Sequence, residues 1–450
     1  MNKLFPKSQS GNEFFKMILL AFFLVSSLGH TQTFNESKLD SVFDVLEAHD
    51  KFMGSIAISK NGNSIYSRTL GYAVVENRKR PDSTTKYRIG SISKTFTATL
   101  ILMAFEEGKI GLDDTLSKFF PEIENAEDIT ITNLLQHQSG IFNFTNAPDY
   151  LTWNTQAKTR ENMLEIIKKH ANVFKPGSQT AYSNSNYVLL AFILEDIFKK
   201  PYSQIIAEKI AIPLKLQNTY VGGPIAVTNN ESYSYRFSGK WMKQNETDMS
   251  IPIGAGSIVS TPSDLNTFII ALFNKKLISA ENLEKMTTTK NGMGLGLIQF
   301  PFRNQMGYGH NGGIDGFSSF LGYLENSKIA IALTSNGTVY NNNDILIHAL
   351  SAVEGYTFDI PDFTEKEVNL KVLNTYIGIY SSEQFPLKIT VSVNNGTLTA
   401  QATGQSSFPL TATSDTVFRF DGAGIVMEFV PDTNKMILKQ GGAVFNYVKE

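Results

Sequence analysis

The chain has 450 residues, of which 42% are hydrophobic, and its formal net charge is -2. This length suggests one large domain with a smaller one, or two to three domains, with sizeable cores. The near-neutral charge argues against a nucleic-acid-binding protein, which should carry a basic excess. The sequence contains no cysteine, which excludes disulfides, a thiolate nucleophile and cysteine-ligated metal sites.

Residues 1–32 are typical of a secretory signal peptide. Three lysines precede an apolar run at 17–28, and the small residues Ser27 and Gly29 follow where a peptidase would cut. The run is shorter than the roughly 20 residues that span a membrane. We therefore expect a secreted or periplasmic protein with no transmembrane segment in the mature chain; the pattern does not fix the cleavage site.

Residues 33–355 alternate between strand-like and helical patterns, which predicts a catalytic domain of the α+β class. Strands at both ends with helices between them indicate an antiparallel sheet flanked by helices. Thr261-Pro262-Ser263-Asp264 is a strong helix start. The predicted elements are a hairpin at 54–60 and 64–70, helices at 91–107, 131–136, 161–170 and 187–199, and a second hairpin at 316–324 and 328–335.

Residues 356–368 are short, charged and poor in strand pattern, and we interpret them as a linker. Residues 369–450 lack helical periodicity and predict a small all-β domain. Its expected strands lie at 388–393, 397–402, 416–420, 425–429 and 436–439.

Ser91 and Lys94 are the most informative pair in the chain. Three residues apart on a helix, their side chains share one face. A serine hydroxyl is a poor nucleophile until a base takes its proton, and a lysine can be that base if its charge is suppressed. A helix start also offers unpaired N–H groups and a positive dipole end to developing negative charge. The pair therefore predicts a nucleophile with its base.

Ser83 and Lys86 have the same spacing, which shows how short this pattern is. They follow Pro81-Asp82 without a helix to align them, and we interpret them as a solvated loop. For Ser91 and Lys94 the plain alternative is a capping serine beside a surface lysine, and the pattern alone leaves both readings open.

Tyr182 and Asn184 precede the helix expected from residue 187. A nearby lysine ammonium would lower the pKa of the tyrosine phenol from its usual value near 10, so that it could accept and return a proton. The asparagine could hold a substrate amide or steady the lysine. The alternative is a buried tyrosine with a turn asparagine.

His310-Asn311-Gly312-Gly313 lies just before the strand expected at 316–324. Its glycines would let a substrate approach that strand closely, and one strand N–H together with that of Ser91 could form an oxyanion hole. The alternative is a glycine-rich turn with a solvated histidine.

Other chemistries lack their motifs. The sequence has no Gly-x-Ser-x-Gly, no His-Glu-x-x-His, no phosphate loop and no dinucleotide fingerprint. Its six histidines are widely spaced, which argues against a zinc hydrolase. We expect an enzyme that needs neither a metal nor an organic cofactor.

In this order the motifs resemble the serine β-lactamase and DD-peptidase superfamily, in particular its class C β-lactamase-like branch, which includes penicillin-binding proteins, esterases and D-aminopeptidases. The resemblance covers about residues 40–350. It rests on Arg88 to Lys94, Glu107-Gly108-Lys109, Leu112-Asp113-Asp114, Leu134 to Gly140, Pro176-Gly177, Tyr182-Ser183-Asn184 and Gly309 to Gly313.

The resemblance implies that Ser91 is acylated, that Lys94 and Tyr182 share the proton transfers and that Asn184 contacts the substrate. It places His310, Asn311 and Gly312 at the third motif as substrate-binding residues, with the backbone amides of Ser91 and Gly313 as the oxyanion hole. We read His137 as structural. True β-lactamases usually carry Lys-Thr-Gly or Lys-Ser-Gly at the third motif, so this departure argues against β-lactamase activity but not against a hydrolase.

The C-terminal stretch is similar to the lipocalin-like β-barrel modules often appended to such hydrolases. We expect an exported serine acyl-hydrolase that acts through a Ser91 acyl-enzyme on an ester, a D-amino-acid peptide or a β-lactam. The alternative is a sensor that β-lactams acylate without efficient turnover. The partner is a small-molecule or peptide substrate and not a nucleic acid; the sequence does not specify the natural substrate, the oligomeric state or the role of the barrel.

Overall fold

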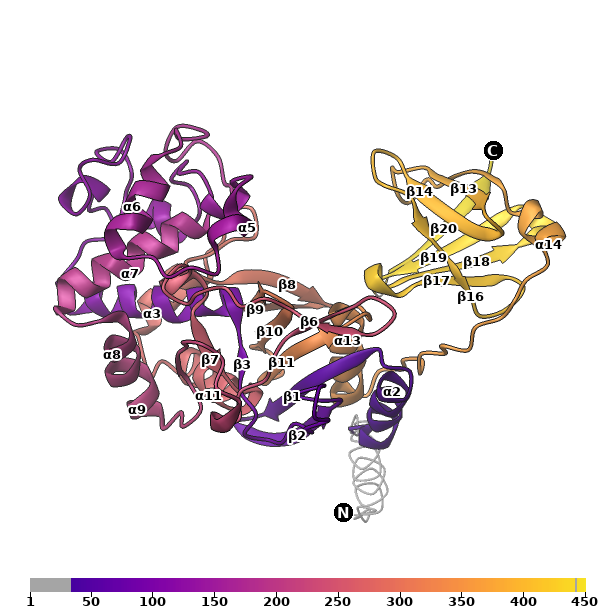
Figure 1. Ribbon diagram of the computed structural model, residues 1–450, viewed down its shortest axis with the longest axis horizontal. Coiled ribbons are helices and arrows are strands. Elements are labelled where there is room, and N and C mark those ends of the chain that lie inside the picture. The colour runs from indigo at the N-terminus through magenta and orange to yellow at the C-terminus, as the bar shows by residue number, and fades with distance from the viewer. Residues whose placement is uncertain (1–33, 442) are drawn as a thin grey trace, which may run out of the picture.

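The computed structural model of the protein describes residues 34–441 and 443–450 (Figure 1). The expected signal peptide, residues 1–32, lies outside the described residues. Within the described ranges, no helix combines the length and apolar character that crossing a membrane requires.

A six-stranded antiparallel sheet forms the centre of the larger part of the molecule. Its strand order is β2-β1-β11-β10-β9-β8, so the two predicted hairpins pair with each other through β1 and β11. The strands are β1 (Phe52–Lys60), β2 (Asn63–Leu70), β8 (Ile298–Phe302), β9 (Gln305–Ile314), β10 (Phe317–Leu324) and β11 (Ile329–Thr338).

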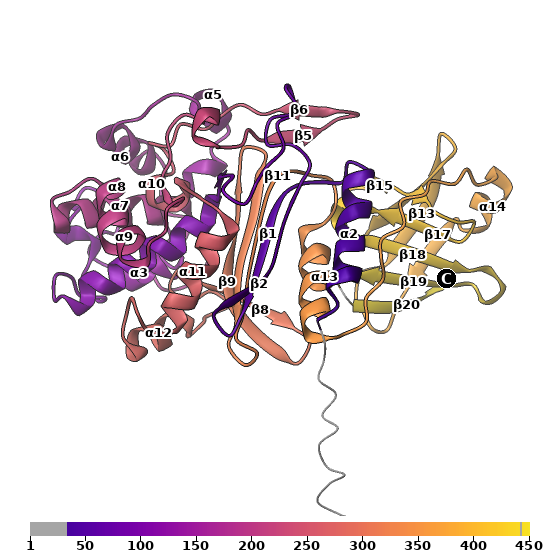
Figure 2. The ribbon, with the colours of Figure 1, turned by 90° about the horizontal axis from the view of Figure 1, so that it is seen from below.

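Helices cover both faces of this sheet (Figure 2). One face carries α2 (Glu36–Ala48) and α13 (Asn342–Glu354), whose apolar residues form one core with β1 and β11. The other carries α11 (Pro262–Phe273), with α3 (Ser93–Glu106) and α7 (Asn184–Phe198) behind it in a second core. The predicted α+β fold, an antiparallel sheet flanked by helices, is confirmed.

Local signals placed several helices correctly. Thr261 caps α11 by accepting a hydrogen bond from the Asp264 N–H, with Pro262 in the first turn, as its sequence predicted. The other helices and the short strands are α4 (Ile131–Leu135), α5 (Tyr150–Trp153), α6 (Arg160–Lys168), α8 (Tyr202–Ile206), α9 (Ile212–Leu214), α10 (Ile253–Gly256), α12 (Ala280–Thr287), β3 (Tyr87–Arg88), β4 (Tyr220–Val221), β5 (Tyr235–Phe237), β6 (Trp241–Lys243) and β7 (Ile258–Ser260).

The C-terminal part is a nine-stranded antiparallel sheet that curls into a nearly closed barrel after α14 (Leu370–Thr375). Apolar side chains fill it, among them Tyr380, Phe418 and Phe429. The strands are β12 (Gly378–Ser381), β13 (Ile389–Asn394), β14 (Thr397–Ala402), β15 (Phe408–Pro409), β16 (Thr411–Ala412), β17 (Val417–Phe420), β18 (Ile425–Val430), β19 (Lys435–Gln440) and β20 (Ala443–Lys449).

The third motif lies within one strand as well as just before another. Residues 310–313 form part of β9, between β8 and β10, and they directly precede β10 as the sequence predicted. The glycines in and beside this motif avoid close contacts. A Cβ on Gly309 would lie 1.9 Å from the Leu321 carbonyl oxygen, and one on Gly312 would lie 2.0 Å from that of Ile89.

Candidate active site

Ser91 lies in a 3₁₀ turn (Gly90–Ile92) that leads directly into α3, rather than in the first turn of that helix as the sequence predicted. Gly90 has a φ of +50°, and a Cβ there would lie 2.7 Å from the Gly313 backbone nitrogen. Only glycine permits this conformation and this contact together. The turn therefore brings the backbone beside Ser91 against the end of β9.

The side chain of Lys94 reaches Ser91, as their spacing predicted. Lys94 Nζ lies 2.9 Å from Ser91 Oγ. It also donates hydrogen bonds to Asn184 Oδ1 at 2.8 Å and to the Ala255 carbonyl oxygen at 2.7 Å. The whole Lys94 residue is buried, with 0% of its surface exposed.

The surroundings of Lys94 favour its neutral form. Burial holds the pKa of the amine well below its usual value, because transfer out of water penalises the charged form. A neutral amine has two N–H groups and one lone pair. The two oxygens of Asn184 and Ala255 can accept the N–H groups, and the lone pair can then face the Ser91 hydroxyl.

Asn184, the first residue of α7, is held so that its oxygen faces Lys94. Its Nδ2 donates to Asn143 Oδ1 and to Thr145 Oγ1, both at 3.2 Å. Its backbone N–H also donates to Asn143 Oδ1, at 3.0 Å. With the amide nitrogen committed, the amide oxygen is the end that meets the lysine. Of the two roles considered for Asn184, this geometry matches the one that steadies the lysine.

The phenol of Tyr182 has a pKa opposite to expectation. Its ring packs under Lys94 Nζ, 4.8 Å from the ring centroid. Burial nevertheless raises the pKa of the phenol, and a hydrogen bond with Ser91 only partly opposes this shift. The predicted lowering by a lysine ammonium is wrong, because burial drives Lys94 itself towards its neutral form.

Two buried histidines lie around Tyr182. The His137 ring stacks on the tyrosine at 4.4 Å between centroids, and its Nδ1 accepts a hydrogen bond from the Ser183 N–H at 3.1 Å. Burial lowers its pKa well below the usual value. The His310 ring lies 6.4 Å from that of Tyr182. Burial is the largest cause that lowers the pKa of His310, to about 4, so both imidazoles are neutral at pH 7.

A cavity of about 290 Å³ opens beside Ser91. Gly313 and Asn184 line it, as the resemblance implied, but His310, Asn311 and Gly312 are not among its lining residues. His310 is buried behind Tyr182 and Asn311 is exposed. The lining consists of Ser91, Phe144, Thr145, Tyr150, Leu151, Asn154, Asn184, Thr247, Pro252, Ala255, Gly256, Gly313, Ile314 and Asp315.

Known proteins resemble this chain in sequence and fold. Residues 40–353 match the family described as Beta-lactamase. The chain belongs to the beta-lactamase family. The resemblance seen in the ordered motifs is thereby confirmed, and this beta-lactamase-family protein is a serine hydrolase, as its relatives are.

Three proteins within this similarity show which kinds of hydrolase the chain resembles. The Teichoic acid D-alanine hydrolase of Staphylococcus aureus is 28% identical over 306 residues, which are 66% of this chain and 72% of that protein. The structure of a D-stereospecific amidohydrolase from Streptomyces sp. is 29% identical, with a TM-score of 0.59, and covers 66% of this chain and 94% of its own. The octameric penicillin-binding protein homologue from Pyrococcus abyssi is 26% identical, with a TM-score of 0.66, and covers 92% and 99%. The last likeness extends into the C-terminal barrel.

Several residues of this beta-lactamase-family site escaped the sequence analysis. Four residues line the cavity from different segments. Tyr150 lies in the short helix α5, Asn154 at the end of that helix, Thr247 in a loop and Asp315 in the turn between β9 and β10. No periodic pattern marks them, because only the folded chain brings these segments together. Arg88, which contacts Asp315 but does not line the cavity, belongs to the Arg88 to Lys94 stretch that the sequence analysis did single out.

Proposed function

We propose that this protein is an exported serine acyl-hydrolase that acts through an acyl-enzyme on Ser91. The observation that carries the proposal is the 2.9 Å distance between Ser91 Oγ and a buried amine whose pKa is lowered. A base that is neutral near pH 7 can take the serine proton as the hydroxyl attacks a carbonyl carbon.

Backbone amides stabilise the negative charge of the intermediate, and Tyr182 transfers a proton to the leaving group. The backbone amides of Ser91 and Gly313 hold the oxyanion that forms on the carbonyl oxygen. Tyr182 keeps its proton at working pH because its pKa is raised, so it can pass that proton to the leaving group and recover one from Lys94. Water then attacks the acyl-enzyme and releases the acid. No step requires a metal or an organic cofactor.

We infer that the substrates are D-aminoacyl esters or amides rather than β-lactams. Among the described residues that line the cavity there is no lysine or arginine to bind a carboxylate. Phe144, Tyr150, Leu151 and Ile314 offer apolar surface to an acyl side chain. The names of two relatives, a D-alanine hydrolase and a D-stereospecific amidohydrolase, support the same stereochemistry.

Mass spectrometry of the intact mature protein tests the acyl-enzyme. Incubation with p-nitrophenyl acetate should add one acetyl group to wild type and to Ser83→Ala, and none to Ser91→Ala. The methyl esters of D- and L-alanine then test stereochemistry, and D-alanine should be released faster. An acyl adduct with penicillin that persists, without turnover of any ester, would favour the alternative of a β-lactam sensor.

Export is part of the proposal and has its own test. The lysines and the apolar run of residues 1–32 support it. The N-terminal sequence of the protein recovered from the periplasm or medium of a bacterial host should begin after residue 28. Recovery of the uncleaved chain in the cytoplasm would contradict it.

A further inference from the structure

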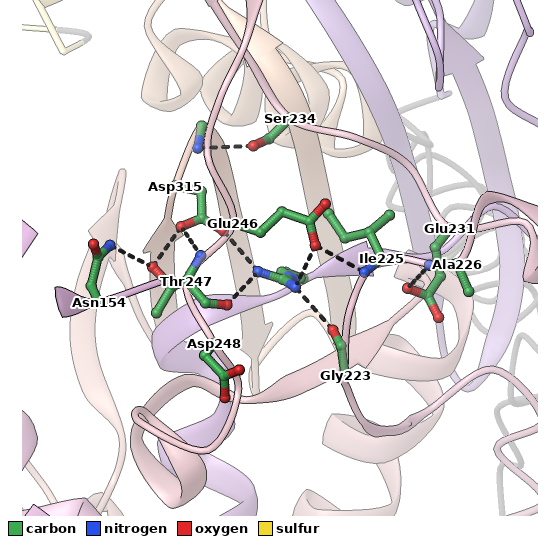
Figure 3. Close-up of polar contacts among 12 residues, drawn as sticks. Asn154, Gly223, Ile225, Ala226, Glu231, Ser234, Glu246, Thr247, Asp248 and Asp315 are labelled. Atoms are coloured by element: carbon green, nitrogen blue, oxygen red, sulfur yellow. Dashed lines mark hydrogen bonds and ion pairs between the residues drawn. The ribbon is translucent and has the colours of Figure 1, made fainter. Parts of the chain in front are cut away.

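Arg88 and Asp315 form an ion pair inside the protein, next to the cavity. Arg88 Nη1 lies 2.9 Å from Asp315 Oδ2, and the two side chains are only 2% and 3% exposed. Figure 3 shows Asp315, Thr247 and Glu246 in a network of polar contacts that joins segments far apart in the sequence. Bringing two charges out of water is costly, so a pair of this kind requires other partners that satisfy its polar atoms.

Such partners are present on both sides, although the buried Arg88 Nε has none among the described residues. Arg88 also donates to the carbonyl oxygens of Thr247 and Gly223, both at 2.9 Å, and Nη2 contacts Glu246 Oε2 at 3.2 Å. Asp315 Oδ1 accepts from the Thr247 backbone N–H at 3.0 Å and from its hydroxyl at 2.7 Å. Both carboxylate oxygens of Asp315 are therefore acceptors.

The network continues to the opposite wall of the cavity. Asn154 Nδ2 donates to Thr247 Oγ1 at 3.1 Å, and the Asn154 carbonyl oxygen accepts from the Asp248 N–H at 2.9 Å. Asn154, Thr247 and Asp315 all line the cavity. The chain of contacts therefore runs from the end of α5, through one loop, to the turn between β9 and β10.

The position of the ion pair in the sequence connects it with the chemistry. Arg88 stands three residues before Ser91, and Asp315 stands two residues after Gly313. Asp315 also has a φ of +54°, a conformation that its interactions have to hold in place. The pair thus joins the two short segments that carry the proposed oxyanion donors.

We propose that Asp315 is a positioning residue for the oxyanion hole, which it holds in place through its ion pair with Arg88. This inference rests on the proposed function, because it needs the Ser91 and Gly313 amides as donors. If the turn at residue 315 shifts, the Gly313 N–H moves relative to Ser91. Substrate binding through the apolar walls then stays, while stabilisation of the oxyanion weakens.

Asp315→Asn separates this role from simple packing. Asparagine has almost the same shape but offers one acceptor end and one donor end. The amide nitrogen must then face either the N–H group of Arg88 or the Thr247 N–H. Two donors meet at that contact, which becomes repulsive. Arg88 keeps Glu246 as a partner, so the variant should still fold.

Glu246→Gln is the matched control on the same arginine. A single atom, Glu246 Oε2, accepts hydrogen bonds from Arg88 at 3.2 Å and from the Ile225 N–H at 2.9 Å. A glutamine oxygen can keep both hydrogen bonds, and its amide nitrogen can take the other carboxylate position of a side chain that is 29% exposed. The charge next to Arg88 is lost in both variants, but only Asp315→Asn disturbs the turn.

The test compares steady-state kinetics with inhibition by a boronic acid that forms a tetrahedral adduct with Ser91. In Asp315→Asn, kcat for a p-nitrophenyl ester should fall about tenfold to a hundredfold with KM little changed, and the boronic acid should bind more weakly by a similar factor. Glu246→Gln should stay within about twofold of wild type in both measurements. Thr247→Val, which removes the hydroxyl that donates to Asp315, should lower kcat in the same direction and serves if Asp315→Asn does not fold.

Two outcomes would overturn the positioning role. One is an Asp315→Asn enzyme with wild-type kcat, and the other is a loss of kcat without any loss of boronic acid affinity. A wild-type protein that is not acylated on Ser91 would instead contradict the proposed function, so the two failures are distinguishable.

Discussion

Lys94 Nζ lies 2.9 Å from Ser91 Oγ, and the lysine that carries it has no exposed surface. The same burial that brings the two groups into contact lowers the pKa of the amine, so position and basicity have one physical origin. A lysine three residues from a serine on an exposed helix would have the spacing but would stay charged.

Replacing Ser91 with alanine should abolish turnover and covalent labelling while the fold remains. Loss of a nucleophile of this kind removes roughly four or more orders of magnitude in rate. Ser83→Ala is the matched control, because Ser83 is exposed and the amine of its apparent partner Lys86 donates instead to the Asn229 carbonyl oxygen. Turnover and active-site titration of both variants check this, and an inactive Ser83→Ala with an active Ser91→Ala would reverse the assignment.

Lys94→Arg should be nearly as damaging as Lys94→Ala, because arginine cannot give up its proton. In the wild type the rate should rise as the pH rises through the lowered pKa of Lys94, since the neutral amine is the base. The measurement is kcat/KM against pH for the wild type and at one alkaline pH for the variants. Substantial activity of the arginine variant would mean that Lys94 serves only as a charge.

His310 should make the protein less stable in mild acid. Its pKa is about 4 in the folded state against 6.5 as its ordinary value, so below pH 6.5 the unfolded chain binds the extra proton. The stabilising contribution is complete above pH 6.5 and is lost as the pH falls towards 4. From these values the loss between pH 7.5 and pH 5 is about 2 kcal/mol.

Urea unfolding of wild type and His310→Gln at these two pH values measures that loss. His137 and His348, whose pKa values are also lowered, remain in both proteins, so the difference between the two pH dependences reports residue 310 and its effect on His137. Equal pH dependence of the two proteins would mean that His310 keeps an ordinary pKa.

The features that the sequence predicted correctly are those that local patterns of residues determine. The hairpins, the Thr261 cap and the Ser91–Lys94 spacing depend on neighbouring residues, and the structure contains all of them. Strand β20 was missed because Val444 and Val448 are about half exposed, so apolar residues occur on both of its faces. The pKa of Tyr182 was predicted with the wrong sign because burial, which comes from distant segments, raises it.

A chain that ends at Asp362 should fold and keep its activity, and we propose residues 356–368 as the linker that makes this possible. All residues that line the cavity precede residue 316. The barrel contacts the larger part through the ion pair between Lys51 and Asp421, and Gly424 packs closely against Asp344. Losing these contacts, together with Phe363 from the core that α2 and α13 form with the sheet, should lower Tm and leave kcat/KM within roughly threefold.

Thermal unfolding and ester hydrolysis by the shortened chain check this expectation. Lys51→Met in the full chain is the matched control, because it removes the ion pair and leaves the barrel attached. A folded shortened chain without activity would show that the barrel contributes to the site or to its access.

The last prediction concerns substrates: small esters should be hydrolysed faster than cephalosporins over the whole range from pH 5.5 to 8.5. The carboxylate of a β-lactam needs a cationic partner, and a hydrogen bond to a charged group contributes about 1.5–3 kcal/mol. By the resemblance of the motifs, His310 takes the place of the lysine usual in true β-lactamases, but its pKa of about 4 keeps it neutral throughout this range. With the reference pKa near 6.5, a solvated histidine would gain charge towards pH 6, but the buried environment of His310 prevents this.

The measurement is kcat/KM for a chromogenic cephalosporin and for a p-nitrophenyl ester, side by side across that range. Because His310 does not gain charge, the ratio of the two values should stay constant to within about threefold, while both follow the titration of Lys94. Efficient cephalosporin turnover by the wild type at pH 8, above that of the ester, would instead identify the chain as a true β-lactamase.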